Sequence, residues 1–207
     1  MSQYFAVHPE NPQARLIQQA VQILRQGGVM VYPTDSGYAL ACRIGDKNAM
    51  ERICQIREVD KDHHFTLMCR DLSELATYAR VNNQAFRLLK NNTPGHYTFI
   101  LVATKEVPKR LLNARRKTIG IRVSDDPITM ALTESLGEPL MSTSLVMKGE
   151  EFAESDPYEI RWRLEHAVDV IIDGGHRGEE PTTVVDMSGD EIEILRAGAG
   201  DVGPFAG

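Results

Sequence analysis

The sequence predicts an α/β fold in which helices cover a mixed sheet. Short β-rich runs alternate with helical patterns along the whole chain, as expected for helices packed on a sheet. The last two predicted strands, over 183–186 and 191–195, have no helix between them, which favours an antiparallel pair within the sheet. A chain of 207 residues with 42% hydrophobic and 25% charged residues can bury a sizeable core. We therefore expect one domain over residues 1–207.

Capping and turn-forming residues delimit these elements. Asn11-Pro12 gives the first helix an N-cap and a first helical residue, and Gly27-Gly28 ends it. Pro33 stops the first strand, a Thr-Asp-Ser-Gly turn leads into the second, and Asp46 can cap the second helix. After the first helix the elements are strands over 29–32 and 38–42, the helix after Asp46, a strand over 65–69, helices over about 71–79 and 82–91, strands over 97–103 and 119–123, a helix over about 127–136, a strand over 139–144, a helix near 157–167, and strands over 168–172, 183–186 and 191–195.

One long loop is predicted, over residues 150–159. It is acidic and has Gly149 and Pro157 at its edges. Such a loop is either solvated surface or the lid of an active site, and the sequence leaves both open.

Composition excludes several classes of protein. No apolar run approaches the roughly 18 residues of a membrane span, and the N-terminus lacks a secretion signal, so we expect a cytoplasmic protein without a membrane partner. The cysteines, Cys42, Cys54 and Cys69, have no CxxC spacing, and the histidines have no ligand spacing, so no metal site is expected. The net charge of −6 argues against a uniformly basic nucleic-acid binder but leaves a local basic face open.

Residues 105–117 form such a basic segment, with six basic residues and one acid in an otherwise acidic chain. Cations gathered on one face neutralise phosphates and release counterions, which gives affinity for RNA without sequence preference. The alternative is a solvated basic helix and loop. The residues predicted to contact RNA are Lys109, Arg110, Arg115, Arg116 and Lys117.

Polar segments at the ends of predicted strands are the candidates for a small-molecule site, because ligands of open α/β sheets bind at carboxyl ends of strands. The usual nucleotide-binding motifs are missing. Ser142-Thr143-Ser144 could hold a phosphate or carboxylate, or could satisfy its own backbone. Arg122 lies in an apolar strand, where either an internal carboxylate or an anionic ligand must compensate its charge.

Seven segments in series carry a resemblance that covers nearly the whole chain. The segments are YPTDSGYAL (32–40), QIREVDK (55–61), PGHYTFIL (94–101), IGIRVSDDP (119–127), MSTSLV (141–146), PTTVVD (181–186) and ILRAGAG (194–200). They resemble the YrdC-like family, and their order and spacing match one single-domain branch of it. The resemblance implies a YrdC-like fold, a twisted open sheet with a large concave, basic surface that binds double-stranded RNA or tRNA.

The resemblance also implies a reaction. Related enzymes are L-threonylcarbamoyladenylate synthases, which convert L-threonine, bicarbonate and ATP to threonylcarbamoyl-AMP and pyrophosphate in the modification of tRNA to N6-threonylcarbamoyladenosine at position 37. By position in the motifs, the ATP-binding residues would be Arg57, Lys61, Arg122, Ser144 and Arg196. The threonine-binding residues would be Thr34, Ser142 and Thr182, the last standing where the family usually has serine. No catalytic residue is assigned.

Two departures from the family pattern predict weak or absent catalysis. Active members have a lysine where this chain has Gln55 and an asparagine where it has Val146. Loss of an ammonium beside a polyphosphate removes charge stabilisation, and a valine side chain forms no hydrogen bond. The first hypothesis is therefore an RNA-binding protein with a weakened nucleotide site, and the second is the synthase, with ATP as substrate and Mg²⁺ if active. A ligand-free scaffold would require an internal carboxylate for Arg122.

Overall fold

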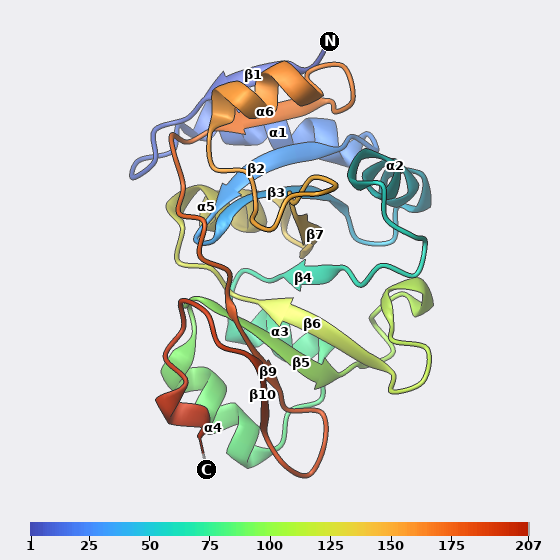
Figure 1. Cartoon of the computed structure of the whole chain (residues 1–207), viewed down its shortest axis with the longest axis vertical. Helices are drawn as coiled ribbons and strands as arrows, with labels where there is room; N and C mark the ends of the chain where they lie inside the picture. The colour runs from blue at the N-terminus through green and yellow to red at the C-terminus, as the bar shows by residue number, and fades with distance from the viewer. Residues whose placement is uncertain (207) are drawn as a thin grey trace.

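The computed structural model describes residues 1–206, in which ten strands form one mixed, open sheet (Figure 1). Their order across the sheet is β1-β8-β2-β3-β7-β4-β6-β5-β9-β10. The pairs β1-β8, β2-β8, β4-β6 and β5-β9 are parallel and the other five are antiparallel, which confirms the predicted mixed sheet. The strands are β1 (Gln3–Ala6), β2 (Met30–Thr34), β3 (Gly37–Arg43), β4 (Thr66–Met68), β5 (Tyr97–Val102), β6 (Thr118–Arg122), β7 (Leu140–Ser144), β8 (Val170–Asp173), β9 (Thr183–Asp186) and β10 (Glu193–Arg196).

Six α-helices flank this sheet in the described part of the chain. They are α1 (Ala14–Arg25), α2 (Lys47–Arg57), α3 (Leu72–Tyr78), α4 (Asn83–Asn92), α5 (Pro127–Leu136) and α6 (Pro157–Leu164). Helices α1 and α5 pack on each other and against β2 and β3, whereas α6 lies against β8 at the end of the molecule opposite α4 (Figure 1). None of the helices described is both long and apolar enough to cross a membrane.

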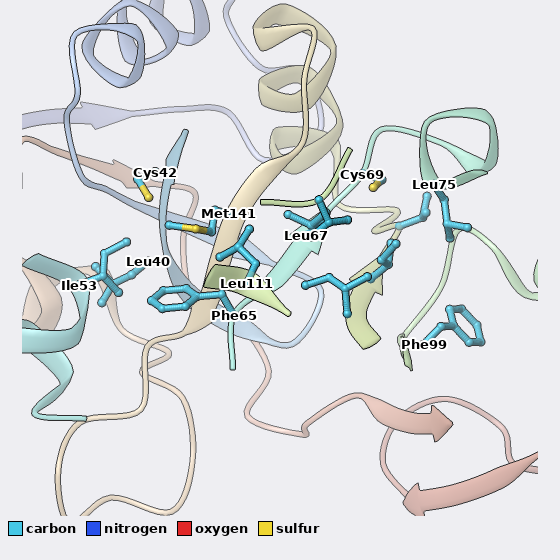
Figure 2. Close-up of a cluster of buried hydrophobic side chains, with 14 of the residues drawn as sticks. Leu40, Cys42, Ile53, Phe65, Leu67, Cys69, Leu75, Phe99, Leu111 and Met141 are labelled. Carbon is cyan, nitrogen blue, oxygen red and sulfur yellow. The ribbon is translucent and has the colours of Figure 1, made fainter. Parts of the chain in front are cut away.

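The central strands are buried on both faces. Along β2 and β3, successive residues contribute to two different apolar clusters, so these strands read as continuous apolar runs rather than as alternating ones. In the larger cluster Ile53 of α2 lies with Leu40, Phe65 and Met141 (Figure 2). Fully burying one such side chain stabilises the fold by about 1.5–3 kcal/mol.

Three details of the elements differ from the prediction. β1 was not predicted, because this four-residue edge strand is only half-buried and depends on parallel pairing with β8. β2 continues through Pro33, which is tolerated because the pairing with β8 ends at Val31 and leaves one side of the strand without a partner. Helix α1 begins at Ala14, since the Nδ1 atom of His8 accepts the N–H groups of Glu10 and Asn11 and holds this segment in a turn.

Candidate functional site

A cavity of about 450 Å³, the main cavity, opens over the middle of the sheet, and six of the eight residues predicted to bind ATP or threonine line it. It includes the carboxyl end of β7, but also the amino ends of β4 and β5, where Thr66 and Thr98 lie. The cavity therefore meets the carboxyl ends of some strands and the amino ends of others, because neighbouring strands of a mixed sheet run in opposite directions. The cavity is lined by Ser36, Arg57, His63, His64, Thr66, Thr98, Arg122, Ser142, Thr143, Ser144, Val146, Glu151, Phe152, Ala153, Glu179, Pro181, Thr182, Val184 and Arg196.

Arg57, the last residue of α2, is a half-buried cation at this cavity. Its Nη1 donates to Thr143 Oγ1 at 2.7 Å, and its Nε donates to the carbonyl of Val146 at 3.1 Å. Among the described residues, no carboxylate lies within ion-pair distance of this guanidinium. Burial lowers the pKa of Arg57, as expected for a charge withdrawn from water without compensation. An anion in the cavity would supply that compensation.

His63 lies against Arg57, a position that sequence reasoning missed. Its Nε2 is 3.0 Å from Arg57 Nη1 and 2.9 Å from Thr143 Oγ1. Burial, together with the charge of Arg57, lowers the pKa of His63 to about 4, so the imidazole is neutral and its Nε2 accepts a hydrogen bond from Arg57. The signal in the sequence was its place two residues before Phe65, which is buried and precedes β4.

Arg196, the last residue of β10, is a further cation that lines the cavity. Its Nε and Nη2 donate to the carbonyl of Thr182 at 3.0 and 2.8 Å. The hydroxyl of Thr182 lies 2.8 Å from that of Thr98, so strands β5, β9 and β10 are joined at this point. Partial burial and the positive charge of Arg122 lower the pKa of Arg196. Like Arg57, it forms no ion pair within residues 1–206.

Arg122 finds its compensating charge inside the protein. Its Nη2 lies 2.7 Å from Asp35 Oδ1, and the two side chains are only 7% and 2% exposed. Ser124 Oγ donates to the same oxygen at 2.7 Å. The structure thus decides between the two alternatives that the sequence left open for Arg122, in favour of an internal carboxylate. Arg122 still lines the cavity.

The three residues predicted to bind threonine have different surroundings. Ser142 is buried, and its hydroxyl lies 2.7 Å from that of Tyr32, whose pKa burial raises to about 12. Thr182 reaches the cavity as described. Thr34 is buried, and its hydroxyl donates to the carbonyl of Gly37 at 2.7 Å, which closes the β2–β3 turn. Ser36, two residues further on, lines the cavity.

The two positions that depart from the family pattern are separated in space. Val146 lines the main cavity, where it presents an apolar side chain beside Arg57. Gln55 lines a separate cavity of about 250 Å³ together with Lys61, which was predicted to contact ATP. Gln55 and Lys61 are exposed, and Glu51 and Glu58 line the same separate cavity. Lys61 is therefore not among the residues that line the main cavity.

The basic segment 105–117 borders the same region. Lys109 begins a short 3₁₀ turn, and the five predicted RNA contacts are all exposed. Arg116 differs from the others because its Nη2 lies 2.7 Å from the buried carboxylate of Asp186. Arg116 also lines a cavity of about 170 Å³ that shares His64, Thr66 and Thr98 with the main one. The loop and the cavity thus form one continuous surface.

Comparisons with known proteins agree with this fold. The family model for Sua5, YciO and YrdC, described as "Telomere recombination", matches residues 22–198. YciO of Escherichia coli K12 is 65% identical over 205 residues, which cover 99% of this chain and 100% of that protein, and the crystal structure of E. coli YciO matches with a TM-score of 0.95. A threonylcarbamoyl-AMP synthase of Vibrio vulnificus is 29% identical over 187 residues, 88% of this chain and 98% of that one. Sua5 of P. abyssi, crystallised with L-threonine, shares the fold at 24% identity, with a TM-score of 0.86 over 94% of this chain and 57% of its own.

Proposed function

Because the chain belongs to the Sua5/YciO/YrdC family, we propose that it binds double-stranded RNA or tRNA through the basic segment 105–117 and holds a nucleotide in the main cavity. The observation that carries the nucleotide site is the pair Arg57 and Arg196. Both line the cavity, and neither has a carboxylate partner among the described residues. Two uncompensated guanidiniums at one cavity are the arrangement that a polyphosphate stabilises.

The dimensions and the remaining side chains fit such a ligand. A volume of about 450 Å³ lies within the range of roughly 300–1,000 Å³ that is usual for small-molecule sites. ATP would place its phosphates by Arg57 and Arg196, with Ser144 as a further contact. Arg122 lines the same cavity, but Asp35 already compensates its charge, so it would hold the nucleotide by a hydrogen bond rather than as a free charge. Lys61 would have to reach the phosphates from the separate cavity that it lines, and threonine would contact Ser142, Thr182 and the turn of Thr34.

Several features weaken this site relative to an efficient enzyme. Val146 has no group to hydrogen-bond a substrate, and Gln55 supplies no ammonium. Glu151 and Glu179 on the rim add negative charge that opposes a polyphosphate. We therefore expect nucleotide affinity in the millimolar range and slow chemistry.

The alternative function is L-threonylcarbamoyladenylate synthesis, and a relative named threonylcarbamoyl-AMP synthase supports it. The threonine amine would join the carbon of bicarbonate with loss of water, and an oxygen of the resulting carbamate would attack the α-phosphorus of ATP and release pyrophosphate. Mg²⁺ would enter with ATP as part of the substrate. Arg57 and Arg196 would stabilise the charge that develops on the phosphates.

RNA binding rests on exposed cations beside the cavity. Lys109, Arg110, Arg115 and Lys117 form no ion pair within residues 1–206, so their charges remain available for phosphates. A duplex on this segment would lie next to the nucleotide because Arg116 lines the cavity that continues into the main one.

Calorimetric titration with ATP, together with an assay for pyrophosphate and threonylcarbamoyl-AMP, tests the nucleotide site. Wild type should bind ATP weakly, and Arg196→Ala should bind it at least about tenfold more weakly, because a hydrogen bond to a charged group contributes about 1.5–3 kcal/mol. Arg15→Ala, an exposed arginine on α1, is the matched control and should bind as wild type does. Absence of heat at millimolar ATP would refute the site, and a rate equal to that of an active synthase would favour the alternative.

A further inference from the structure

A second cluster of chemically reactive side chains lies beside the cavity, where the β2–β3 turn meets the start of β5 and the loop before α5. It contains Asp35, His96 and Asp125. One ligand atom from each residue lies within 4.8 Å of the ligand atoms of the other two. The residues are far apart in the sequence, so motif spacing gave no sign of this cluster.

Two facing atoms of the cluster are buried without a hydrogen-bond partner. The Asp35 side chain is 2% exposed, and its Oδ1 accepts from Arg122 and Ser124. Its other oxygen, Oδ2, forms no hydrogen bond, and neither does His96 Nδ1. The two atoms lie 3.2 Å apart, a distance at which they form an ion pair only when the imidazole is protonated. An unsatisfied buried polar atom costs about 1–3 kcal/mol, so native proteins seldom leave two of them face to face.

The separation of these atoms suits a metal ion between them. Zn²⁺ bonds to histidine nitrogen and carboxylate oxygen at about 2.0–2.2 Å, and ligand angles between octahedral and tetrahedral values then place the two atoms about 2.9–3.5 Å apart. The observed 3.2 Å between Asp35 Oδ2 and His96 Nδ1 lies within this range. Asp125 is exposed, so its carboxylate can turn inward to become a third ligand.

The local charge also favours a cation. Asp35, Asp125 and Asp126 contribute three carboxylates, whereas Arg122 and Arg177 contribute two guanidiniums. Arg177 Nη2 lies 3.1 Å from Asp126 Oδ2, and Arg122 is paired with Asp35 Oδ1, so Asp125 and the second oxygen of Asp35 remain for a ligand.

We propose that Asp35, His96 and Asp125 bind a divalent transition-metal ion, with Zn²⁺ as the preferred one. An imidazole with two carboxylates suits Zn²⁺, whereas Mg²⁺ and Ca²⁺ favour sites made of oxygen alone. Three protein ligands leave a position for water or substrate, as in catalytic zinc sites. Arg122 links this site to the cavity, because it contacts Asp35 and lines the cavity as well.

Zinc titration of the chelator-treated full chain tests this site without nucleotide or RNA, so its outcome is independent of the proposed function. Wild type should bind one Zn²⁺ by calorimetry, with a rise in the melting temperature and with Mg²⁺ much weaker. In His96→Gln and Asp125→Asn the affinity for Zn²⁺ should fall by at least about tenfold. Loss of a residue that only hydrogen-bonds to a metal ligand already lowers metal affinity by about tenfold or more, and loss of the ligand itself should cost no less. Asp125 is exposed, so its variant should fold normally.

His166→Gln is the matched control. His166 is 76% exposed and lies 3.5 Å from Glu165, so it offers an exposed histidine–carboxylate pair elsewhere on the surface. This variant should bind Zn²⁺ as wild type does. The proposal is overturned if wild type binds no Zn²⁺ at millimolar concentration, if the Asp125 variant keeps full affinity, or if the His166 variant loses as much as the His96 variant.

Discussion

Arg57 Nη1 and His63 Nε2 lie 3.0 Å apart, so a neutral imidazole accepts a hydrogen bond from a half-buried guanidinium. Thr143 Oγ1 contacts both, at 2.7 and 2.9 Å. His63 accepts a hydrogen bond from Arg57 but carries no negative charge. The part of the cavity where these two side chains meet therefore keeps a net positive charge.

His63 should make stability depend on pH. Burial and Arg57 lower its pKa to about 4 in the folded protein, against about 6.5 in the unfolded chain. The folded state therefore resists protonation, and the corresponding stability is fully present above pH 6.5 and is lost as the pH falls towards 4. Urea unfolding should show the stability of wild type falling relative to His63→Gln across this window. A difference that stays constant from pH 7.5 to 4.5 would contradict the assignment.

Arg57→Lys should weaken ATP binding nearly as much as Arg57→Ala. Lysine keeps the charge but cannot form the forked contacts of a guanidinium with phosphate oxygens. A loss of about tenfold or more is expected from removing a charged hydrogen bond. Calorimetry on both variants, with circular dichroism to verify folding, provides the measurement. If Arg57→Ala binds ATP like wild type, Arg57 does not contact the phosphates.

Gln55→Lys combined with Val146→Asn should raise the formation of threonylcarbamoyl-AMP. The asparagine would place an amide in the main cavity. The lysine would have to extend past Glu58 from the separate cavity that Gln55 lines to reach the main cavity. Residues that act together are strongly non-additive, so each single change should do less than half of the double change on a logarithmic scale. Chromatographic measurement of threonylcarbamoyl-AMP tests this prediction. A folded, ATP-binding but inactive double variant would place the deficit elsewhere.

Duplex RNA should bind with a strong salt dependence and little sequence preference. Changing Arg110, Arg115 or Lys117 to alanine should each flatten the slope of log affinity against log salt by somewhat under one unit, about equally for unrelated duplexes. Arg116→Ala should flatten it less, because Asp186 already neutralises that side chain. Fluorescence titrations at several salt concentrations measure the slopes. Slopes unchanged in all four variants would show that RNA does not contact this segment.

Arg122→Met should destabilise the protein by about 3–5 kcal/mol, because it leaves the buried carboxylate of Asp35 without its countercharge. Ser124 and His96 remain beside that carboxylate but supply no permanent charge. Chemical unfolding of the variant beside Arg110→Ala, an exposed control, tests this. A loss below about 1 kcal/mol would show that the pair is solvated like a surface ion pair.

The sequence by itself determined most elements and several site residues. Apolar periodicity, caps such as Asp46 and Asp126, and turn residues act within a few positions, so α2, α5 and the central strands could be placed from local information. The mixed sheet followed from the missing helix between the last two strands, which the antiparallel β9–β10 pair confirms. The basic segment was equally visible, since charge is a property of composition.

Only the tertiary structure decided which side chains meet. Asp35 pairs with Arg122, and Arg57 with Thr143, because β4 lies between β7 and β6 and brings distant segments together. Strand order depends on the packing of all elements at once, and no local propensity encodes it. For the same reason the sequence missed β1, whose pairing with β8 joins residues 3–6 to residues 170–173. It also missed the group Asp35, His96 and Asp125, whose ligand atoms converge only when three loops meet.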